Sequence, residues 1–325
     1  MPHLITQRQQ NFAEMAFRGL QPWHGLGQQV RSGASLDEWR KAAGLDWEIL
    51  RSPVKFEHGS LRTFRAHDVL YRNDNSMPIS IVSPRYRIVQ PREALAFFED
   101  LVTSAGFEIE TAGSLAGGKR IWVLARTGFA GEVVPSDDVT GYLLLATSYD
   151  GNMATIAQFT SVRVVCANTL QLVLNGDTSC SVRIRHSTEF EADKVKDALG
   201  IAAKDAWDLF MKRMQILANL RLTSSDFGDV VRDLIRPRVS PDKRKIVDDT
   251  DGFKKIMALF NGHGRGSLLD GCRETAWGGI NAITQWVDHE VAARSRENRL
   301  TSAWFGAGAR LKEEATLKLL ELAGQ

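Results

Sequence analysis

The run TGYLLLATSYDGNMATIAQFTSVRVV, from Thr140 to Val165, contains two strand-like segments and the turn between them. The turn is Asp150-Gly151-Asn152, and Asp-Gly between two β-prone runs is among the stronger local signals for a β-hairpin. Two further strand-like runs, FEIETAGSL and KRIWVLART, come just before and are joined through Ala-Gly-Gly. Four strands joined by short turns predict an antiparallel meander.

Upstream of the meander, the sequence predicts a helix, a hairpin and a strand that leads into a second helix. Ser35 can cap the first helix, Glu38 completes a capping box three residues on, and Gly44 ends the helix. DWEILRSPVKFE predicts a strand broken at Pro53, and the turn NDNS between DVLYR and PISIV predicts a hairpin. In SPRYRIVQPREALAFFEDLVTSAG, a short strand precedes a helix that begins at Pro91.

Downstream of the meander, the pattern loosens. In VCANTLQLVLNG, residues 165–176, apolar residues recur at helical spacing before the stop signal Asn175-Gly176, which predicts a short helix. Cys166 lies at the junction, where packing is the expected role of a small apolar residue. SVRIRH, residues 181–186, alternates apolar and basic residues and predicts another strand.

The chain after His186 is predicted to be helical. Residues 189–220 predict one long helix with a heptad-like seam, which either packs internally or forms a subunit contact. The seam residues are Val195, Leu199, Ala202, Ala206, Leu209, Arg213, Ile216 and Leu220. Further helices are predicted up to Ile235, over FKKIMALF, and in the last segments of the chain. The fold class is therefore α+β, with an α+β domain at 1–188 and a helical region at 189–325.

Composition narrows the class of protein. The 325 residues are 43% hydrophobic and 25% charged, as in ordinary folded proteins, and the net charge is only +2. Any basic surface must therefore come from the placement of cations, since there is no large excess of them. Three cysteines give no complete disulfide framework, and the sequence has neither a signal-peptide core nor an apolar run of about 18 residues. These features predict a cytoplasmic protein without a membrane span.

No motif for a metal or a nucleotide cofactor stands out. Gly262, Gly264 and Gly266 follow a predicted helix and precede no lysine, which favours an interhelical loop over a phosphate-binding loop. The histidines are scattered, and no HExxH, paired CxxC or EF-hand spacing appears. We therefore expect no cofactor and no metal site.

Arginine placement is the most informative feature for function. Arginines flank a tyrosine in one predicted strand, alternate along another and end a third. If these strands are neighbours, the guanidinium groups share a face that follows phosphates, and the tyrosine can stack on a base. The alternative is a solvated strand face on which each arginine pairs with a carboxylate. The predicted nucleic-acid-binding residues are Arg85, Tyr86, Arg87, Arg163, Arg183, Arg185 and His186.

Several stretches resemble one known family. They are PWHGLG, PRYRIVQPREALAFFEDL, VRVVCANTL followed by RIRH, TAWGGINAITQWVDH and WFGAGARLKEEA, in the order in which the family has them. The family is the phage/plasmid-related group catalogued as domain of unknown function 932. The resemblance implies a cytoplasmic protein carried by phages, prophages or plasmids, usually without an assigned activity. The β-β-β-α order around VRVVCANTL also resembles the core of phage single-strand annealing proteins, a likeness of fold that transfers no function by itself.

Three hypotheses follow. The first is a non-enzymatic DNA-associated protein that binds or anneals single-stranded DNA, with the helical region covering the sheet or assembling a homo-oligomeric ring. The second is an enzyme with a pocket near Cys166, Asn168 and His186, which requires these side chains to converge. The third is a protein that binds a host factor through the seam from Val195 to Leu220.

Overall fold

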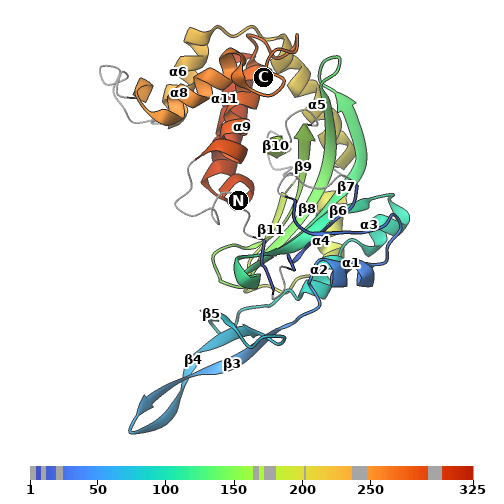
Figure 1. Cartoon of the computed structure of the whole chain (residues 1–325), viewed down its shortest axis with the longest axis vertical. Coiled ribbons are helices and arrows are strands. Elements are labelled where there is room, and N and C mark those ends of the chain that lie inside the picture. The colour runs from blue at the N-terminus through green and yellow to red at the C-terminus, as the bar shows by residue number, and fades with distance from the viewer. Residues whose placement is uncertain are drawn as a thin grey trace. The chain divides into compact units, whose positions relative to one another are not determined.

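The computed structural model describes residues 5–8, 12–19, 25–163, 168–171, 181–200, 203–235, 247–291 and 302–324 (Figure 1). Contacts divide the chain into two compact units. Unit 1 comprises Met1–Gly128, Tyr142–Gln158 and Ser181–Ile201, and unit 2 comprises Phe129–Gly141, Phe159–Cys180 and Ala202–Gln325. Each unit is assembled from three separate segments, and the contiguous domains 1–188 and 189–325 stay a prediction.

An eight-stranded sheet contains the predicted meander. Its path runs β10-β9-β8-β7-β6-β1-β2, and β11 also pairs with β9. The meander strands β6 to β9 are neighbours in sequence order, and the α+β fold class is confirmed. The strands are β1 (Met15–Phe17), β2 (Gln28–Gln29), β6 (Glu108–Leu115), β7 (Arg120–Glu132), β8 (Asp138–Ser148), β9 (Thr155–Arg163), β10 (Asn168–Gln171) and β11 (Ser181–Ile184).

Local turn chemistry explains why the meander could be predicted. At the β8–β9 turn, the Asp150 side chain accepts a hydrogen bond from the Asn152 backbone at 3.1 Å, and Gly151 adopts a φ of +73°. Between β6 and β7, the Ala-Gly-Gly segment forms the turn η2 (Ala116–Gly118). Gly118 has a φ of +91°, and a Cβ there would lie 2.9 Å from the Arg72 guanidinium. Both turns therefore require glycine at these positions.

The helix predicted over 165–176 is wrong where it can be checked. Residues Asn168–Gln171 form β10, which pairs antiparallel with Thr160–Arg163 at the end of β9. β11 pairs with the first half of β9, at Thr155–Gln158. A short apolar run cannot be assigned to helix or strand from its spacing alone. Here the edge of β9 offers backbone hydrogen bonds to residues 168–171, and these residues form a strand. The expected β-β-β-α order is consequently absent at residues 168–171, and the rest of this segment lies outside the described residues.

Unit 1 also contains a separate three-stranded sheet, ordered β3-β4-β5. Its strands are β3 (Ile49–His58), β4 (Ser60–Arg72) and β5 (Pro78–Val82). The β4–β5 hairpin was predicted from its NDNS turn. Pro53 does not break β3 as expected, because the chain continues through a shift in register between Pro53 and Val54. The long β3–β4 hairpin beyond that shift was not predicted.

The helices among the described residues of unit 1 are α1 (Leu36–Ala42), α2 (Pro91–Ala96), α3 (Glu99–Ser104) and α4 (Ala192–Gly200). The predicted capping box is confirmed at α1, where the Ser35 hydroxyl accepts from the Glu38 backbone and the Glu38 side chain accepts from the Ser35 backbone. Pro91 is the first residue of α2, as predicted. α1 contacts β1 and α2, and α4 contacts β11.

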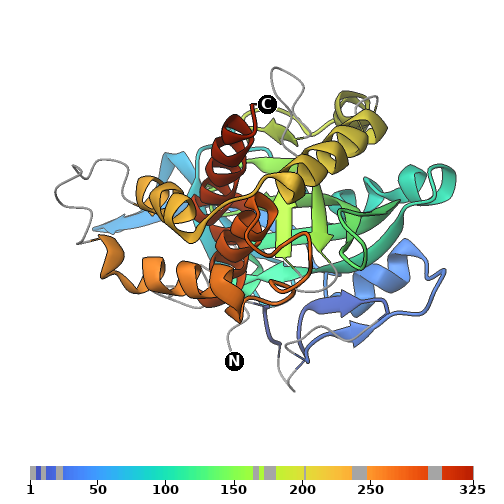
Figure 2. The ribbon, with the colours of Figure 1, turned by 90° about the horizontal axis from the view of Figure 1, so that it is seen from above.

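Unit 2 is built around a buried helix. Its helices are α5 (Ala203–Asn219), α6 (Ser224–Ile235), α8 (Asp251–Ala258), α9 (Ala276–Gln285) and α11 (Ala307–Leu322), with π-helical turns η4 (Leu259–His263) and η5 (Trp286–Glu290). Every residue of α9 is buried, and α5, α8, α11 and β10 all contact this helix (Figures 1 and 2). None of the described helices has both the length and the apolar content of a membrane span.

The predicted heptad seam is only partly the packing face of α5, because its residues Ala206 and Arg213 are buried at 1% and 6%. Leu209, a seam residue, is 36% exposed, whereas its neighbours Trp207 and Phe210 are buried at 5% and 2%. The buried stripe of α5 faces the interior of unit 2, where α5 contacts α9. The predicted single helix also corresponds to two elements, α4 and α5. The buried seam residues are not accessible to a host factor, and binding of a host factor through the rest of the seam stays a prediction.

Candidate functional site

The segment from Ser83 to Arg87 is a loop, although a short strand was predicted there. It follows β5 directly and turns where the Tyr86 backbone amide donates to the Ser83 carbonyl at 3.0 Å. Arg51 of β3 fixes the loop by donating to the carbonyls of Pro84 and Tyr86, at 3.1 and 2.7 Å. The backbone conformation here is therefore set by a side chain from another strand, and alternation along the segment could not reveal it.

Tyr86 and His186 hold this loop against the end of β11. Their rings stack with centroids 4.3 Å apart and an interplanar angle of 15°. The Tyr86 hydroxyl donates to the Ser148 carbonyl at 2.7 Å, and Tyr86 is only 8% exposed. Burial raises the pKa of Tyr86 well above its ordinary value of 10. The tyrosine thus has a structural role, and its ring is not available to stack on a base as the sequence suggested.

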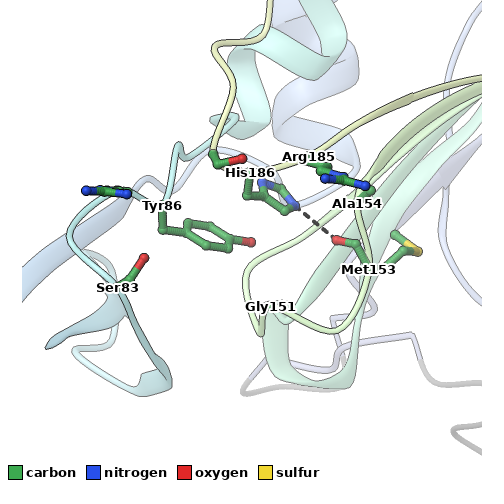
Figure 3. Close-up of a pocket in the computed structure, with 9 residues that line it drawn as sticks. Ser83, Tyr86, Gly151, Met153, Ala154, Arg185 and His186 are labelled. Carbon is green, nitrogen blue, oxygen red and sulfur yellow. Dashed lines mark hydrogen bonds between the residues drawn. The ribbon is translucent and has the colours of Figure 1, made fainter. Parts of the chain in front are cut away.

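The His186 imidazole lies between two backbone carbonyls. Nδ1 is 3.0 Å from the Arg87 oxygen and Nε2 is 3.0 Å from the Met153 oxygen, the contact drawn in Figure 3. The Arg87 backbone amide also donates to the His186 carbonyl at 2.5 Å. Burial lowers the pKa of His186, although both carbonyls favour its protonated form. A neutral imidazole donates from one nitrogen only, so at neutral pH one of the two carbonyls receives no hydrogen bond from the ring.

A cavity of about 320 Å³ opens beside this stack, and we refer to it as the Tyr86–His186 pocket. Two arginines, Arg85 and Arg185, contribute positive charge to its wall. Figure 3 shows that its walls come from the loop after β5, the β8–β9 turn and the segment after β11. The lining residues are Ser83, Arg85, Tyr86, Gly151, Met153, Ala154, Arg185, His186 and Ser187.

Four of the predicted arginines have exposed side chains: Arg85, Arg87, Arg183 and Arg185. Within the described part of the chain, none of these four exposed arginines forms an ion pair with a carboxylate. Some other surface arginines of unit 1 are paired, such as Arg31 with Glu38 at 3.0 Å and Arg126 with Glu110 at 2.7 Å. The alternative in which every arginine is neutralised therefore does not hold for the four exposed arginines.

A family model described as "Domain of unknown function (DUF932)" matches residues 78–304, which is more than half of the chain. The chain belongs to this family. All the residues that line the Tyr86–His186 pocket fall inside the DUF932 segment, whereas the β3–β4 hairpin precedes it. No curated protein and no solved structure matches the chain.

The structure brings most of the predicted site residues of this DUF932 protein together. Arg85, Tyr86, Arg185 and His186 line one pocket, and Arg87 contacts His186 through its backbone. Arg183 lies on β11 opposite Ile156 of β9. The Arg163 side chain lies outside the described residues. Sequence reasoning missed Arg51 and the carbonyl of Met153, because both reach the site only through tertiary contacts.

The enzyme hypothesis gains nothing from this geometry. Cys166 and the Asn168 side chain lie outside the described residues, and both ring nitrogens of His186 already face carbonyl oxygens. A general base needs a free nitrogen within reach of a substrate proton. Among the residues that the structure describes, no three His, Cys, Asp or Glu side chains form a group that could hold a metal ion.

Proposed function

We propose that this DUF932 protein is a non-enzymatic protein that binds single-stranded DNA through the four exposed arginines beside the Tyr86–His186 pocket. The observation that carries the proposal is that these guanidinium groups are exposed and lack carboxylate partners among the described residues, although the chain has almost balanced charge. With 41 basic and 39 acidic residues, unpaired cations at one place are not forced by an excess of positive charge.

Arginine is suited to such a role. Its planar guanidinium donates two parallel hydrogen bonds to a phosphate, and it remains charged at any physiological pH. Arg85 and Arg185 reach the same pocket from different segments, so a single strand that crosses the pocket contacts each of them through a different phosphate. The stacked pair Tyr86 and His186 keeps these two segments together and thereby fixes the spacing of the cations.

Other expectations stand beside this proposal. Carriage by phages, prophages or plasmids and a cytoplasmic location suit a DNA-associated protein, and both come from the family resemblance and the composition. A homo-oligomeric state and annealing of complementary strands stay predictions, which the same oligonucleotides and a sedimentation experiment can test. Residues 168–171 form a strand where a helix was expected. The β-β-β-α likeness to single-strand annealing proteins therefore no longer supports annealing.

The direct test is fluorescence anisotropy of a labelled oligo(dT) across a series of salt concentrations. For single strands, the logarithm of the affinity should fall with the logarithm of salt by about 0.7 per phosphate contact. The double variant Arg85→Ala/Arg185→Ala should therefore bind more weakly and lower that slope by about 1.4.

Arg31→Ala is the matched control, because Arg31 is an exposed arginine of the same unit that already pairs with Glu38. It should leave affinity and slope unchanged. Absence of binding at low salt, binding without a salt slope, or equal losses for the control and the double variant would each contradict the proposal.

A further inference from the structure

The β3–β4 hairpin forms an arm that is exposed along most of its length. Beyond the register shift after Pro53, Val54 pairs with Phe64 and His58 pairs with Ser60 at the tip. The residues from Arg65 to His67 have no partner on β3, so this stretch is a large β-bulge. Figure 1 shows β3 and β4 continuing past β5 as a two-stranded ribbon. We refer to residues 54–67 as the arm.

Register places the side chains of the arm on two faces. In an antiparallel ladder, residues directly opposite one another lie on the same face. One face therefore carries the pairs Val54–Phe64, Phe56–Arg62 and His58–Ser60, and the other carries Lys55–Thr63 and Glu57–Leu61. Phe56 and Phe64 are 48% and 46% exposed, and the Phe64 ring stacks on His67 at a centroid distance of 5.5 Å. Phe56 is thus an exposed aromatic ring directly across from an arginine.

The arm is basic. Its charged residues are Lys55, Arg62 and Arg65 against the single carboxylate of Glu57. Among the described residues, no ion pair joins any of these three cations to a carboxylate. A surface of this charge complements a polyanion, whereas packing against the arm of a second copy would bring like charges together. Exposed aromatic rings between cations are the arrangement that single-stranded nucleic acids recognise, since a base can stack on the ring while phosphates meet the cations.

We propose that the arm is a second contact site for single-stranded DNA, in which a base stacks on Phe56 and Arg62, on the same face, contacts a flanking phosphate. This inference rests on the DNA binding proposed above. Arg51 connects the two sites, because it lies on β3 just before the arm and also holds the loop that carries Arg85. The arm lies outside the DUF932 segment, so it would add a contact to whatever that segment provides.

The test compares single substitutions on the two faces of the arm in the full chain. Phe56→Ala should weaken oligo(dT) binding at least about fivefold and leave the salt slope unchanged, because it removes stacking without removing charge. Arg62→Ala should lower the salt slope by about 0.7. Leu61→Ala is the matched control, since Leu61 is a 67% exposed apolar residue on the opposite face. It should bind as the unsubstituted chain does.

A photocrosslink supplies a readout that does not depend on affinity. An oligonucleotide carrying 5-iodouracil should crosslink to the peptide that contains Phe56, and the Phe56→Ala variant should lose this adduct. Because the strand ends of the arm are exposed, circular dichroism and thermal unfolding of each variant should match those of the unsubstituted chain.

The possible outcomes separate the two proposals. Weakened binding by the arm variants supports the inference, even if Arg85→Ala/Arg185→Ala binds normally, a result that would overturn the pocket proposal alone. Normal binding by Phe56→Ala and Arg62→Ala, in a chain whose pocket variant is impaired, overturns the arm. No binding at low salt overturns both. A change in sedimentation of the arm variants without a change in DNA binding overturns the arm as a DNA site and identifies it as a contact between copies of the chain.

Discussion

Arg72 and Glu14 form a doubly hydrogen-bonded ion pair that is closed to water. Arg72 Nη2 lies 2.6 Å from Glu14 Oε1 and Nη1 lies 3.1 Å from Oε2, and the two side chains are 1% and 0% exposed. The Arg72 guanidinium also lies over the Trp47 ring, 4.2 Å from its centroid. Because Arg72 is the last residue of β4, this pair connects the end of that strand to the N-terminal segment of unit 1.

Replacing Arg72 should therefore destabilise unit 1 strongly. Arg72→Met leaves the buried Glu14 carboxylate without its main partner, a change that typically costs 3–5 kcal/mol. Arg8 still contacts Glu14 at 2.7 Å, so we expect a loss near the lower limit, about 3 kcal/mol. Urea denaturation measures it, with Arg31→Met as a control that should cost less than about 1 kcal/mol. If the two variants lost equal free energy of unfolding, the buried ion pair would contribute no more to stability than an exposed one.

Two helical glycines should respond to alanine in opposite directions. A Cβ on Gly278 of α9 would lie 1.9 Å from the Cys272 carbonyl oxygen, so Gly278→Ala forces the backbone apart and should cost at least about 2 kcal/mol. A Cβ on Gly228 of α6 would meet only the Arg232 guanidinium, at an ordinary 3.5 Å. Gly228→Ala should instead stabilise the protein by about 0.5–1 kcal/mol. Thermal unfolding of both variants measures the two changes in stability. If both substitutions stabilised the protein, or both destabilised it, this account of α9 packing would be contradicted.

The stability of the protein should depend on the protonation of His186. Burial lowers the pKa of this imidazole below 6.5 in the folded chain, so the unfolded chain binds more protons once the pH falls through about 6.5. The contribution of neutral His186 to the free energy of unfolding is therefore fully present above pH 6.5. It is lost as the pH falls toward the pKa that His186 has in the folded chain. When the pH is lowered from 8 to about 5, the free energy of unfolding should therefore fall less for His186→Gln than for the unsubstituted chain.

Denaturant unfolding at the two pH values gives the difference directly. If acid instead stabilised the unsubstituted chain relative to His186→Gln, the two carbonyls that face the ring would outweigh its burial.

Asp137 and Trp277 should be energetically coupled. The indole Nε1 of Trp277 donates to Asp137 Oδ2 at 2.7 Å, and both residues are completely buried. Asp137→Ala leaves the indole without this acceptor, and an unsatisfied buried donor costs about 1–3 kcal/mol. A double-mutant cycle with Trp277→Phe isolates the pair, and a coupling energy of at least about 0.5 kcal/mol is expected. Additive losses would mean that the hydrogen bond makes no net contribution.

Much of the meander could be predicted because its signals are local. Asp150-Gly151 and the Ala-Gly-Gly turn specify their own backbone conformations, and the Ser35–Glu38 capping box closes within four residues. The β3–β4 hairpin lacked such a signal. Its turn is His58-Gly59-Ser60, without Asn-Gly or Asp-Gly, and apolar residues are exposed on both of its faces, so no clean alternation marks either strand.

Local patterns predicted one segment of the candidate site better than the other. Alternation correctly predicted the strand at Ser181–Ile184, but Arg85 lies on a loop whose shape depends on Arg51, far away in sequence. Nothing in the local pattern around Tyr86 indicates that His186 covers its ring. β10 was missed for a similar reason, because the edge of β9 that it pairs with is a property of the assembled sheet.

The interleaved segments of the two units constrain how this gene can be divided. A fragment that began at residue 189 would carry Trp277 but not Asp137, which unit 2 takes from its Phe129–Gly141 segment. The same fragment would lack β10, the strand that α9 and α11 contact. Only a fragment that begins at or before residue 129 therefore contains every segment of unit 2, and the helical portion alone is an incomplete unit.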